Sequence, residues 1–369
     1  MAQELKRSLS SEMVGRGHPD KMCDAVGDYI VTAALQQDQE SRVAIETTGG
    51  KGILFITGEI TTQAKLDIKK IARKALEDCG YPNHDKIKIK VNLGKQSQDI
   101  AAGISKDNDE YGAGDQGIMY GYATDETPNR MPLEHFWATT IALYLDYTLV
   151  VMNKGYGSDF KTQVTTIGKK VRKVLVSIQH EDHIPLEQVR DEITRKVKEC
   201  LEVNGVDYQV EITVNPAGKF NSGWFDADAG TTGRKIVVDQ YGSRARVGGG
   251  AFSGKDYTKV DRSAAYMCRY VATNLVAHGI AKQVEIQVAY AIGQADPVSL
   301  AIECYGTNQV PMAEVYRIVR KNFSFKVADI IKQLNLKNTD YRLFSSYGHF
   351  GHYYAAWEQI KETLERDVK

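Results

Sequence analysis

The sequence predicts an α+β fold with three pseudo-symmetric domains, each a mostly antiparallel sheet with helices on one face. Two observations predict this fold. A helix, a two-stranded hairpin and a second helix follow one another three times along the 369 residues. The first helices of the three copies begin near residues 20, 134 and 261, so the repeat is about a third of the chain. The copies share little sequence identity, and chance recurrence of this order is the alternative.

The first copy shows the order most clearly. Apolar residues at helical spacing predict its first helix, and a glycine-rich turn at residues 49–52 predicts its hairpin. Thr61 and Thr62 predict the start of a second helix, which Gly80 ends. The expected elements are a helix at 22–33, strands at 42–47 and 53–59, and a helix from 61 to 79.

The second and third copies repeat these elements. Pro185 opens the closing helix of the second copy, and Pro311 opens that of the third. Gly168 lies in the second hairpin turn, and Gly279 ends the first helix of the third copy. The expected elements are helices at 133–153, 185–203, 261–278 and 311–322, with strands at 162–167, 171–179, 284–292 and 297–305.

The predicted strands do not alternate cleanly between apolar and polar residues. Residues 53–56 and 171–178 carry apolar side chains on both sides of their strands. A sheet of this kind can bury one face against its own helices and the other against a second subunit. The pattern therefore predicts a homo-oligomer.

Composition excludes several classes of protein. Lysine plus arginine and aspartate plus glutamate both number 47, so no net field attracts the chain to nucleic acid or to an anionic membrane. The longest apolar run, residues 137–152, is too short for a membrane span and contains Asp146. The N-terminus has no apolar core of the kind that a signal peptide contains. The five cysteines have no CxxC spacing, which predicts buried, reduced thiols and a cytoplasmic protein.

The glycine-rich stretch at residues 248–256 is the first candidate for chemistry. Glycine lets a ligand approach the backbone, and successive N–H groups form a nest for anions, to which Lys255 adds a charge. The spacing fits a P-loop, but Asp256 stands where the hydroxyl that holds Mg²⁺ would follow. The stretch is either a phosphate cradle of another design or a flexible loop. Cations and acids at residues 228–235 and 259–262 favour a polyphosphate with a divalent metal.

Two acids stand at matching helix starts. Asp20 lies at the start of the first helix and Asp261 at the start of the corresponding helix in the third copy, with Lys259 nearby. They could hold divalent metals or simply cap their helices. His18, in the same loop as Asp20, is a candidate acid or hydrogen-bond donor.

Other acids have both a functional and a structural interpretation. Glu46 lies in a strand and is either a surface position or a ligand for a cation, and Glu59 could meet the amino group of a ligand or be an ordinary surface acid. Asp115 lies in a glycine cluster whose close packing does not account for an acid. The polar, irregular residues 94–109 are typical of a mobile lid or of a disordered linker.

Together these motifs resemble those of the S-adenosylmethionine synthetase, or methionine adenosyltransferase, family. They are Gly-His-Pro-Asp-Lys at 17–21, Gly-Glu-Ile-Thr-Thr at 58–62, Gly-Lys-Gln-Ser at 94–97, Gly-Ala-Gly-Asp-Gln-Gly at 112–117, Thr-Gly-Arg-Lys at 232–235, and the segments 248–256 and 259–265. They run in the family's order over nearly the whole chain. The resemblance implies domains at residues 5–100, 110–223 and 225–362. It also implies a homodimer with active sites at the subunit interface, paired into a homotetramer.

The resemblance also implies a reaction. The sulfur of L-methionine attacks C5′ of ATP and expels triphosphate, which is then cleaved to pyrophosphate and phosphate. A neutral sulfur needs no base, whereas the leaving group carries about four negative charges, so positioning and charge stabilisation must lower the barrier. The implied cofactors are Mg²⁺, two per active site, and K⁺, one per subunit.

The family's functional residues can be carried over by position. The implied catalytic residues are His18, Lys21, Lys161, Arg234, Lys235 and Lys255. The implied ATP-binding residues are His18, Asp159, Phe160, Lys161, Lys219, Phe220, Asp228, Arg234, Lys235, Ala251 and Lys255, with Phe220 stacked on adenine. Methionine is implied at Glu59, Gln96, Asp115, Asp228 and Lys259, with residues 96–106 as a gating loop. Asp20 and Asp261 are the implied Mg²⁺ ligands and Glu46 the implied K⁺ ligand.

The chain departs from the family's pattern in places. Residues 13–16 read Met-Val-Gly-Arg where Ser-Val-Ser-Glu is usual, so Arg16 reverses a charge beside His18. Residues 221–227, with Trp224, replace a Gly-Gly-Pro-x-Gly segment near the adenine site. Tyr257 replaces a usual Pro, and residues 154–158 replace a Leu-Arg-Pro segment. These changes bear on nucleotide affinity and base selectivity more than on the reaction.

Two other functions remain as alternatives. A non-catalytic relative that binds nucleotide or a partner subunit should have lost some of the mapped charges, and this chain retains them all. A generic P-loop NTPase is disfavoured by Asp256.

Overall fold

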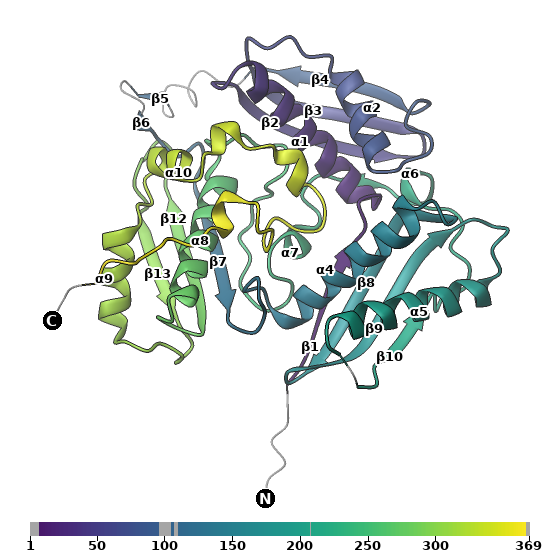
Figure 1. Cartoon of the computed structure of the whole chain (residues 1–369). Helices are drawn as coiled ribbons and strands as arrows, with labels where there is room; N and C mark the ends of the chain where they lie inside the picture. Colours follow the sequence, from purple (N-terminus) through teal and green to yellow (C-terminus); the bar gives the residue numbers. More distant parts are fainter. Residues whose placement is uncertain (1–6, 96–104, 107–109, 207, 367–369) are drawn as a thin grey trace, which may run out of the picture.

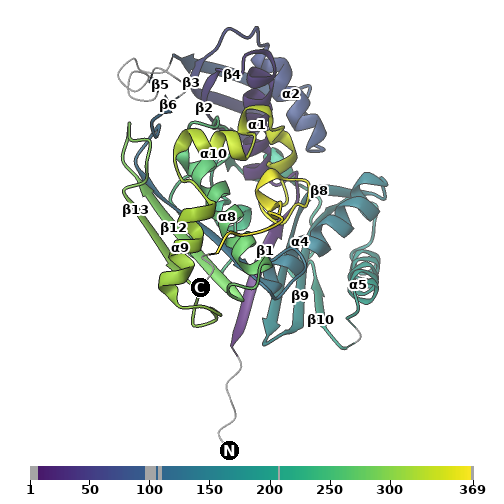
Figure 2. The ribbon, with the colours of Figure 1, turned by 60° about the vertical axis from the view of Figure 1, so that its left-hand side comes forward.

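The computed structural model describes residues 7–95, 105–106, 110–206 and 208–366. Three larger sheets, each with helices packed on it, make up most of this part of the chain (Figure 1). The helices α1, α4 and α8 lie on the sides of their sheets that face the middle of the molecule, as the turned view in Figure 2 also shows. This is the predicted α+β architecture of three units.

The strands of the three sheets come from distant parts of the chain. One sheet has the order β11 (Gly230–Thr231), β2 (Arg42–Gly50), β3 (Ile53–Thr61), β4 (Lys88–Gly94). The second has β1 (Ser8–Val14), β8 (Tyr156–Ile167), β9 (Lys170–His180), β10 (Glu211–Val214), and the third β13 (Ser299–Glu303), β12 (Gln283–Tyr290), β7 (Gly117–Thr124). The short β5 (Ser105–Lys106) and β6 (Glu110–Tyr111) form a separate pair.

Each larger sheet contains a strand that the sequence repeat does not assign to it. β1 precedes the first unit but pairs with β8, β7 pairs with β12 of the last unit, and β11 returns to β2. The sheets are antiparallel except for β3 with β4 and β9 with β10, which are parallel because a helix connects each pair. The units are therefore linked through exchanged strands as well as through packing.

The helices begin where the sequence provides a start signal. The first unit has α1 (Pro19–Gln37) and α2 (Ile68–Asp78), the second α4 (Leu133–Leu145), a π-helical turn (Asp146–Val151) and α5 (Leu186–Val203), and the third α8 (Val260–Ala277), α9 (Met312–Asn322) and α10 (Val327–Gln333). Two short helices, α6 (Trp224–Ala227) and α7 (Ile236–Asp239), lie between the second and third units. Pro132, Pro185 and Pro311 each directly precede a helix.

The three predicted hairpins are confirmed, but the predicted start of the second helix at Thr61 and Thr62 is wrong. β3 continues through Thr61, and α2 begins only at Ile68. The cap is Asp67, whose carboxylate accepts a hydrogen bond from the backbone N–H of Lys70 at 3.0 Å.

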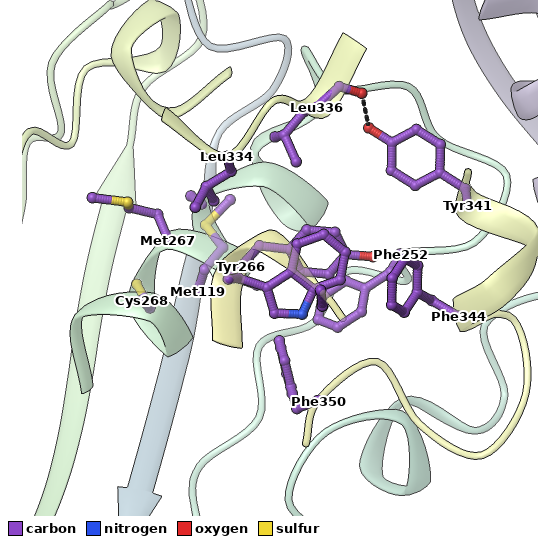
Figure 3. Packing of buried hydrophobic residues seen from close by; sticks show 14 of the residues in the cluster. Met119, Phe252, Tyr266, Met267, Cys268, Leu334, Leu336, Tyr341, Phe344 and Phe350 are labelled. Atoms are coloured by element: carbon purple, nitrogen blue, oxygen red, sulfur yellow. Dashed lines mark hydrogen bonds between the residues drawn. The ribbon is translucent and has the colours of Figure 1, made fainter. Parts of the chain in front are cut away.

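The main core lies around α8, where aromatic side chains from three segments meet (Figure 3). Tyr266 of α8 stacks on Trp357, with ring centroids 3.8 Å apart, and packs edge-on against Phe252. Phe252 belongs to the glycine-rich stretch and is 3% exposed, so this core holds the stretch in place. Close by, the Tyr341 hydroxyl donates a hydrogen bond to the carbonyl of Leu336 at 2.7 Å.

Gly121 of β7 gives a stability prediction. A Cβ at this position would lie 2.2 Å from the backbone carbonyl carbon of Cys268 in α8, so the sheet and the helix can approach only with glycine here. Gly121→Ala should lower the free energy of unfolding by about 1–3 kcal/mol. Gly249→Ala is the control, since a Cβ there meets no atom within 4 Å. Urea denaturation measures both, and equal effects would contradict this account of the packing.

Candidate active site

The end of the glycine-rich stretch is fixed by pairing to β2. The backbone N–H of Ile45 donates to the carbonyl of Gly254 at 2.8 Å, and that of Asp256 donates to Val43 at 3.0 Å. Gly254 has a φ of +83°, and a Cβ there would lie 2.1 Å from the carbonyl oxygen of Ile45. The position of Lys255 is therefore set by a strand, and the flexible-loop interpretation is wrong for this end of the stretch.

A buried carboxylate, Asp28 of α1, holds the stretch from the other side. It accepts hydrogen bonds from the hydroxyl of Ser253 at 2.8 Å and from the backbone N–H of Gly254 at 3.0 Å. It also pairs with Arg262 of α8 at 2.5 Å, and neither of these two side chains is exposed. The loop is thus tied to both α1 and α8.

A cavity of about 740 Å³ lies beside the stretch. Its charged lining residues are Glu46, Asp115, Lys255 and Asp261, and its backbone lining includes Ala251 and residues 248–250. Among the residues that the structure describes, this lining does not include His18, Asp20, Asp159, Lys161 or Lys235. The candidate site residues therefore form two groups, which we call the cradle group (Glu46, Asp115, Ala251, Lys255, Asp261) and the His18 group (His18, Asp20, Asp159, Lys161, Lys235).

The cradle group contains a lysine–aspartate pair. The ammonium of Lys255 lies 2.6 Å from the carboxylate of Asp261, in the first turn of α8. A Cβ on Gly250 would lie 2.0 Å from the carboxyl carbon of Asp261, so glycine lets the backbone of the stretch reach this carboxylate. The N-cap of α8 is Lys259, not Asp261, which rules out the capping alternative for this acid.

The His18 group contains a second pair of the same kind. The ammonium of Lys235 lies 2.6 Å from Asp20, and the backbone N–H of Thr231 donates to the other carboxylate oxygen at 2.9 Å. Burial opposes ionisation of Asp20, but the hydrogen bonds from Lys235 and Thr231 outweigh it and lower its pKa. His18 is the N-cap of α1, so Asp20 also does not cap its helix.

His18 is held as a neutral imidazole. Burial lowers its pKa to about 3, and the nearby charges of Lys235, Lys161 and Lys21 act in the same direction. Nδ1 accepts the backbone N–H of Asp20 at 3.2 Å. In a neutral ring the proton must then be on Nε2, which makes His18 a hydrogen-bond donor and not a general acid at neutral pH.

Lys21 lies near His18, but its ammonium is paired with buried carboxylates. Its side chain is 1% exposed and pairs with Asp239 at 2.5 Å and with Asp24 at 2.9 Å. Burial alone would lower the pKa of Lys21, but Asp239 and Asp24 together raise it above its usual value. Lys21 thus pairs with two buried carboxylates in this structure, and its implied catalytic role stays a prediction.

Asp159 and Phe160 differ in what they can offer a ligand. Burial raises the pKa of Asp159 to about 6, and one carboxylate oxygen accepts the backbone N–H of Trp224 at 2.7 Å. The Phe160 ring is fully buried in the core of the second unit, and its carbonyl accepts the N–H of Gly15 at 2.8 Å. The Phe160 side chain therefore shapes the loop before His18 and cannot itself contact a nucleotide.

The remaining candidates lie near the surface. Lys161, Asp228 and Arg234 are exposed, and Phe220 and Glu59 are partly buried. Lys219 pairs with Asp182 at 3.2 Å, and Lys259 pairs with Asp256 at 2.8 Å. Gln96 and most of the implied gating loop lie outside the described residues.

The comparisons with known proteins agree with the motifs. Models of the N-terminal, central and C-terminal domains of S-adenosylmethionine synthetase match residues 6–99, 110–220 and 222–359. An S-adenosylmethionine synthase of Mesoplasma florum is 43% identical over 97% of this chain and 99% of its own length. That of Mycoplasmopsis pulmonis is 44% identical over 94% of this chain and 94% of its own length. That of Akkermansia muciniphila is 41% identical over 100% of this chain and 99% of its own length.

The chain belongs to the S-adenosylmethionine synthetase family. Its two lysine–aspartate pairs stand at the first turns of α1 and α8, in the first and third units of the fold. Within the described residues, no helix is long and apolar enough to cross a membrane. The five cysteines are free and buried.

Sequence reasoning missed residues that organise this synthetase site. Asp28 and Asp239 form buried ion pairs with partners more than 200 positions away in the sequence, so no local pattern shows them. Trp224 was noted only as a departure from the family's pattern, yet it contacts Asp159 and Ser158. An aromatic residue within the segment that replaces the family's glycine-rich one was the available signal.

The burial of Lys21 gives a prediction that separates its role from that of Lys255. Lys21→Met leaves Asp24 and Asp239 buried without their cation and should lower the free energy of unfolding by about 3–5 kcal/mol. Lys255→Met is the matched control: its side chain is 25% exposed, and its removal should cost within about 1 kcal/mol. Denaturant titrations decide, and a stable Lys21→Met variant would show that Lys21 is not a structural cation.

Proposed function

We infer that this protein is a methionine adenosyltransferase, which transfers the adenosyl group of ATP to the sulfur of L-methionine. The released triphosphate is then cleaved to pyrophosphate and phosphate. The observation that carries this inference is similarity to S-adenosylmethionine synthases along nearly the whole chain, at 43% identity over 97% of it for the Mesoplasma florum protein. The cations and the backbone N–H groups of the glycine cradle would stabilise the negative charge of the departing triphosphate.

Charge stabilisation is the main task of the site. Methionine sulfur is nucleophilic without deprotonation, so no general base is required. Lys161, Arg234, Lys235 and Lys255 would surround the triphosphate, and backbone N–H groups near Ala251 would add donors. The neutral His18 would donate from Nε2 to an oxygen near C5′, a contact that strengthens as that oxygen gains charge.

The residues fit magnesium at two places. Asp20 and Asp261 each already hold a cationic ammonium group at 2.6 Å, and carboxylates are the protein ligands that Mg²⁺ prefers. Among the described residues, no three His, Cys, Asp or Glu side chains come together, so phosphate and water oxygens would complete the coordination. We propose two Mg²⁺ per active site. When bound, they would neutralise triphosphate oxygens.

The monovalent cation and the methionine belong to the cradle side of the site in this proposal. Glu46 is an exposed carboxylate of β2 that lines the cavity, and it would hold one K⁺ per subunit. Asp115 lines the same cavity and accepts a hydrogen bond from the adjacent backbone N–H of Gln116 at 2.8 Å. Its carboxylate would bind the ammonium of methionine, with Glu59, Asp228 and Lys259 also near the amino acid.

We propose that two subunits complete each site. The described lining of the cavity includes the cradle group and none of the five residues of the His18 group. Ile53 and Phe55 on the outer face of β3 are 43% and 39% exposed, beside the exposed Glu46. A homodimer through this face would bring the cradle group of one subunit to the His18 group of the other, and two dimers would form the tetramer. Five free thiols suit the reducing cytoplasm as its place of action.

The reaction itself has a direct test. Purified protein with ATP, L-methionine, Mg²⁺ and K⁺ should form S-adenosylmethionine, pyrophosphate and phosphate, identified by mass. Omission of methionine should abolish the sulfonium product. ATP turnover without S-adenosylmethionine would overturn the proposal.

Lys255 is predicted to act mainly in the transition state. Lys255→Met keeps the length of the side chain and removes its charge, so kcat should fall by about 10²–10³ with a smaller change in the KM for ATP. Hydrolysis of added tripolyphosphate should also fall. A rise in the KM for ATP with kcat within about twofold would mean that Lys255 only binds substrate.

A complementation experiment tests the shared site. Lys235→Met and Lys255→Met chains, coexpressed with different affinity tags, should give heterodimers with one intact site and about half of wild-type activity. The control pair, Lys235→Met with Lys161→Met, changes the same group in both chains and should stay inactive. Equal inactivity of the two pairs would place each site within one subunit.

A further inference from the structure

Trp224 occupies a backbone conformation that favours glycine. Its φ is +54°, in the left-handed region, although tryptophan carries a large side chain. It follows Gly223 and begins the short helix α6. A non-glycine residue held in this region costs free energy and persists only when its surroundings determine it, a combination that is frequent at ligand sites.

The surroundings fix the indole in one place. Its Nε1–H donates to the hydroxyl of Ser158 at 2.9 Å, and that hydroxyl donates to the carbonyl of Cys79 at 2.6 Å. The backbone N–H of Trp224 donates to the carboxylate of Asp159 at 2.7 Å. Ring and backbone are therefore both anchored to β8, at the residues that lead to Lys161.

Two glycines leave room for the ring. A Cβ on Gly17 would lie 2.7 Å from Nε1 of Trp224, and a Cβ on Gly157 would lie 2.7 Å from its Cζ2. Gly17 directly precedes His18, and its backbone N–H donates to the carbonyl of Ser158 at 3.0 Å. The indole thus lies between the His18 loop and β8, two of the segments that form the His18 group.

Trp224 stays partly exposed as a residue despite these anchors. The other tryptophans of the chain, Trp137 and Trp357, are 7% and 0% exposed. A partly exposed tryptophan whose backbone N–H binds the Asp159 carboxylate, with the Lys161 cation near that carboxylate, suits a nucleotide. Its π-face can stack on a base, while the carboxylate accepts a hydroxyl and the cation meets phosphates.

We propose that Trp224 is a stacking residue for the purine base of the nucleotide substrate. The proposal rests on the function inferred above and adds a base-binding residue to that site. Stacking is a contact that substrate and transition state share, so it should act on binding and not on the chemical step. It also tolerates any purine, so it should raise affinity without selecting adenine over guanine.

Kinetics of three variants test the proposal. Trp224→Ala should raise the KM for ATP about tenfold or more with kcat within about threefold, and Trp224→Phe should restore most of the loss because a ring remains. Hydrolysis of inorganic tripolyphosphate, which has no base, should be unchanged in both. The control Trp137→Phe should behave as wild type.

Fluorescence gives a readout that does not depend on turnover. A non-hydrolysable ATP analogue should quench the tryptophan emission of the wild type, tripolyphosphate should not, and Trp224→Phe should lose the quenching. An unchanged KM for ATP in Trp224→Ala, or equal loss of ATP and tripolyphosphate reactions, would overturn the stacking role. Absence of product from the wild type would instead overturn the inferred function, and the quenching would still decide whether Trp224 meets a base.

Discussion

The buried carboxylate of Asp28 is the contact on which the site most depends. It joins α1, the glycine-rich stretch and α8 through Ser253, Gly254 and Arg262. A buried ion pair of this kind often adds little net stability, because desolvation of both charges offsets their attraction. Its effect here is positional: it fixes the glycine-rich stretch against α1 and against α8, the helix that carries Asp261.

Two of the cations proposed to meet the triphosphate are already paired with carboxylates in the protein alone. Lys235 pairs with Asp20 and Lys255 with Asp261, and Lys21 pairs with both Asp24 and Asp239 deeper in the structure. The lysines of the Lys235–Asp20 and Lys255–Asp261 pairs are partly exposed to solvent, whereas Lys21 is buried with its partners. Only the two partly exposed pairs can therefore exchange partners without unfolding. A polyphosphate with divalent cations offers both members of such a pair a new partner of opposite charge. These two pairs therefore hold Lys235 and Lys255 in place before a ligand binds.

Local signals in the sequence predicted most helices and hairpins. Contacts between distant positions determined which strands pair and which charged side chains are buried. Glycine turns and helix-starting prolines were sufficient for the hairpins and for most helices, because turn and cap chemistry are local. The exchanged strands β1 and β7 were not predictable, since a repeat of local elements carries no information on which strand pairs with which. Lys21 and Lys255 looked alike as lysines beside glycines and acids. They differ because Asp239, 218 positions away in the sequence, pairs with Lys21 and buries it. The side chain of Lys255 stays 25% exposed.

The central claim is that one site expels an intact triphosphate by attack at C5′, and isotope transfer tests it most directly. ATP labelled with ¹⁸O at the oxygen between C5′ and the α-phosphorus should be turned over with methionine, and the products analysed by mass. The account predicts that all of the label leaves with the phosphate products and none stays with the adenosyl group, because the C5′–O bond breaks. Label retained on the adenosyl product would show cleavage at phosphorus and would contradict the account.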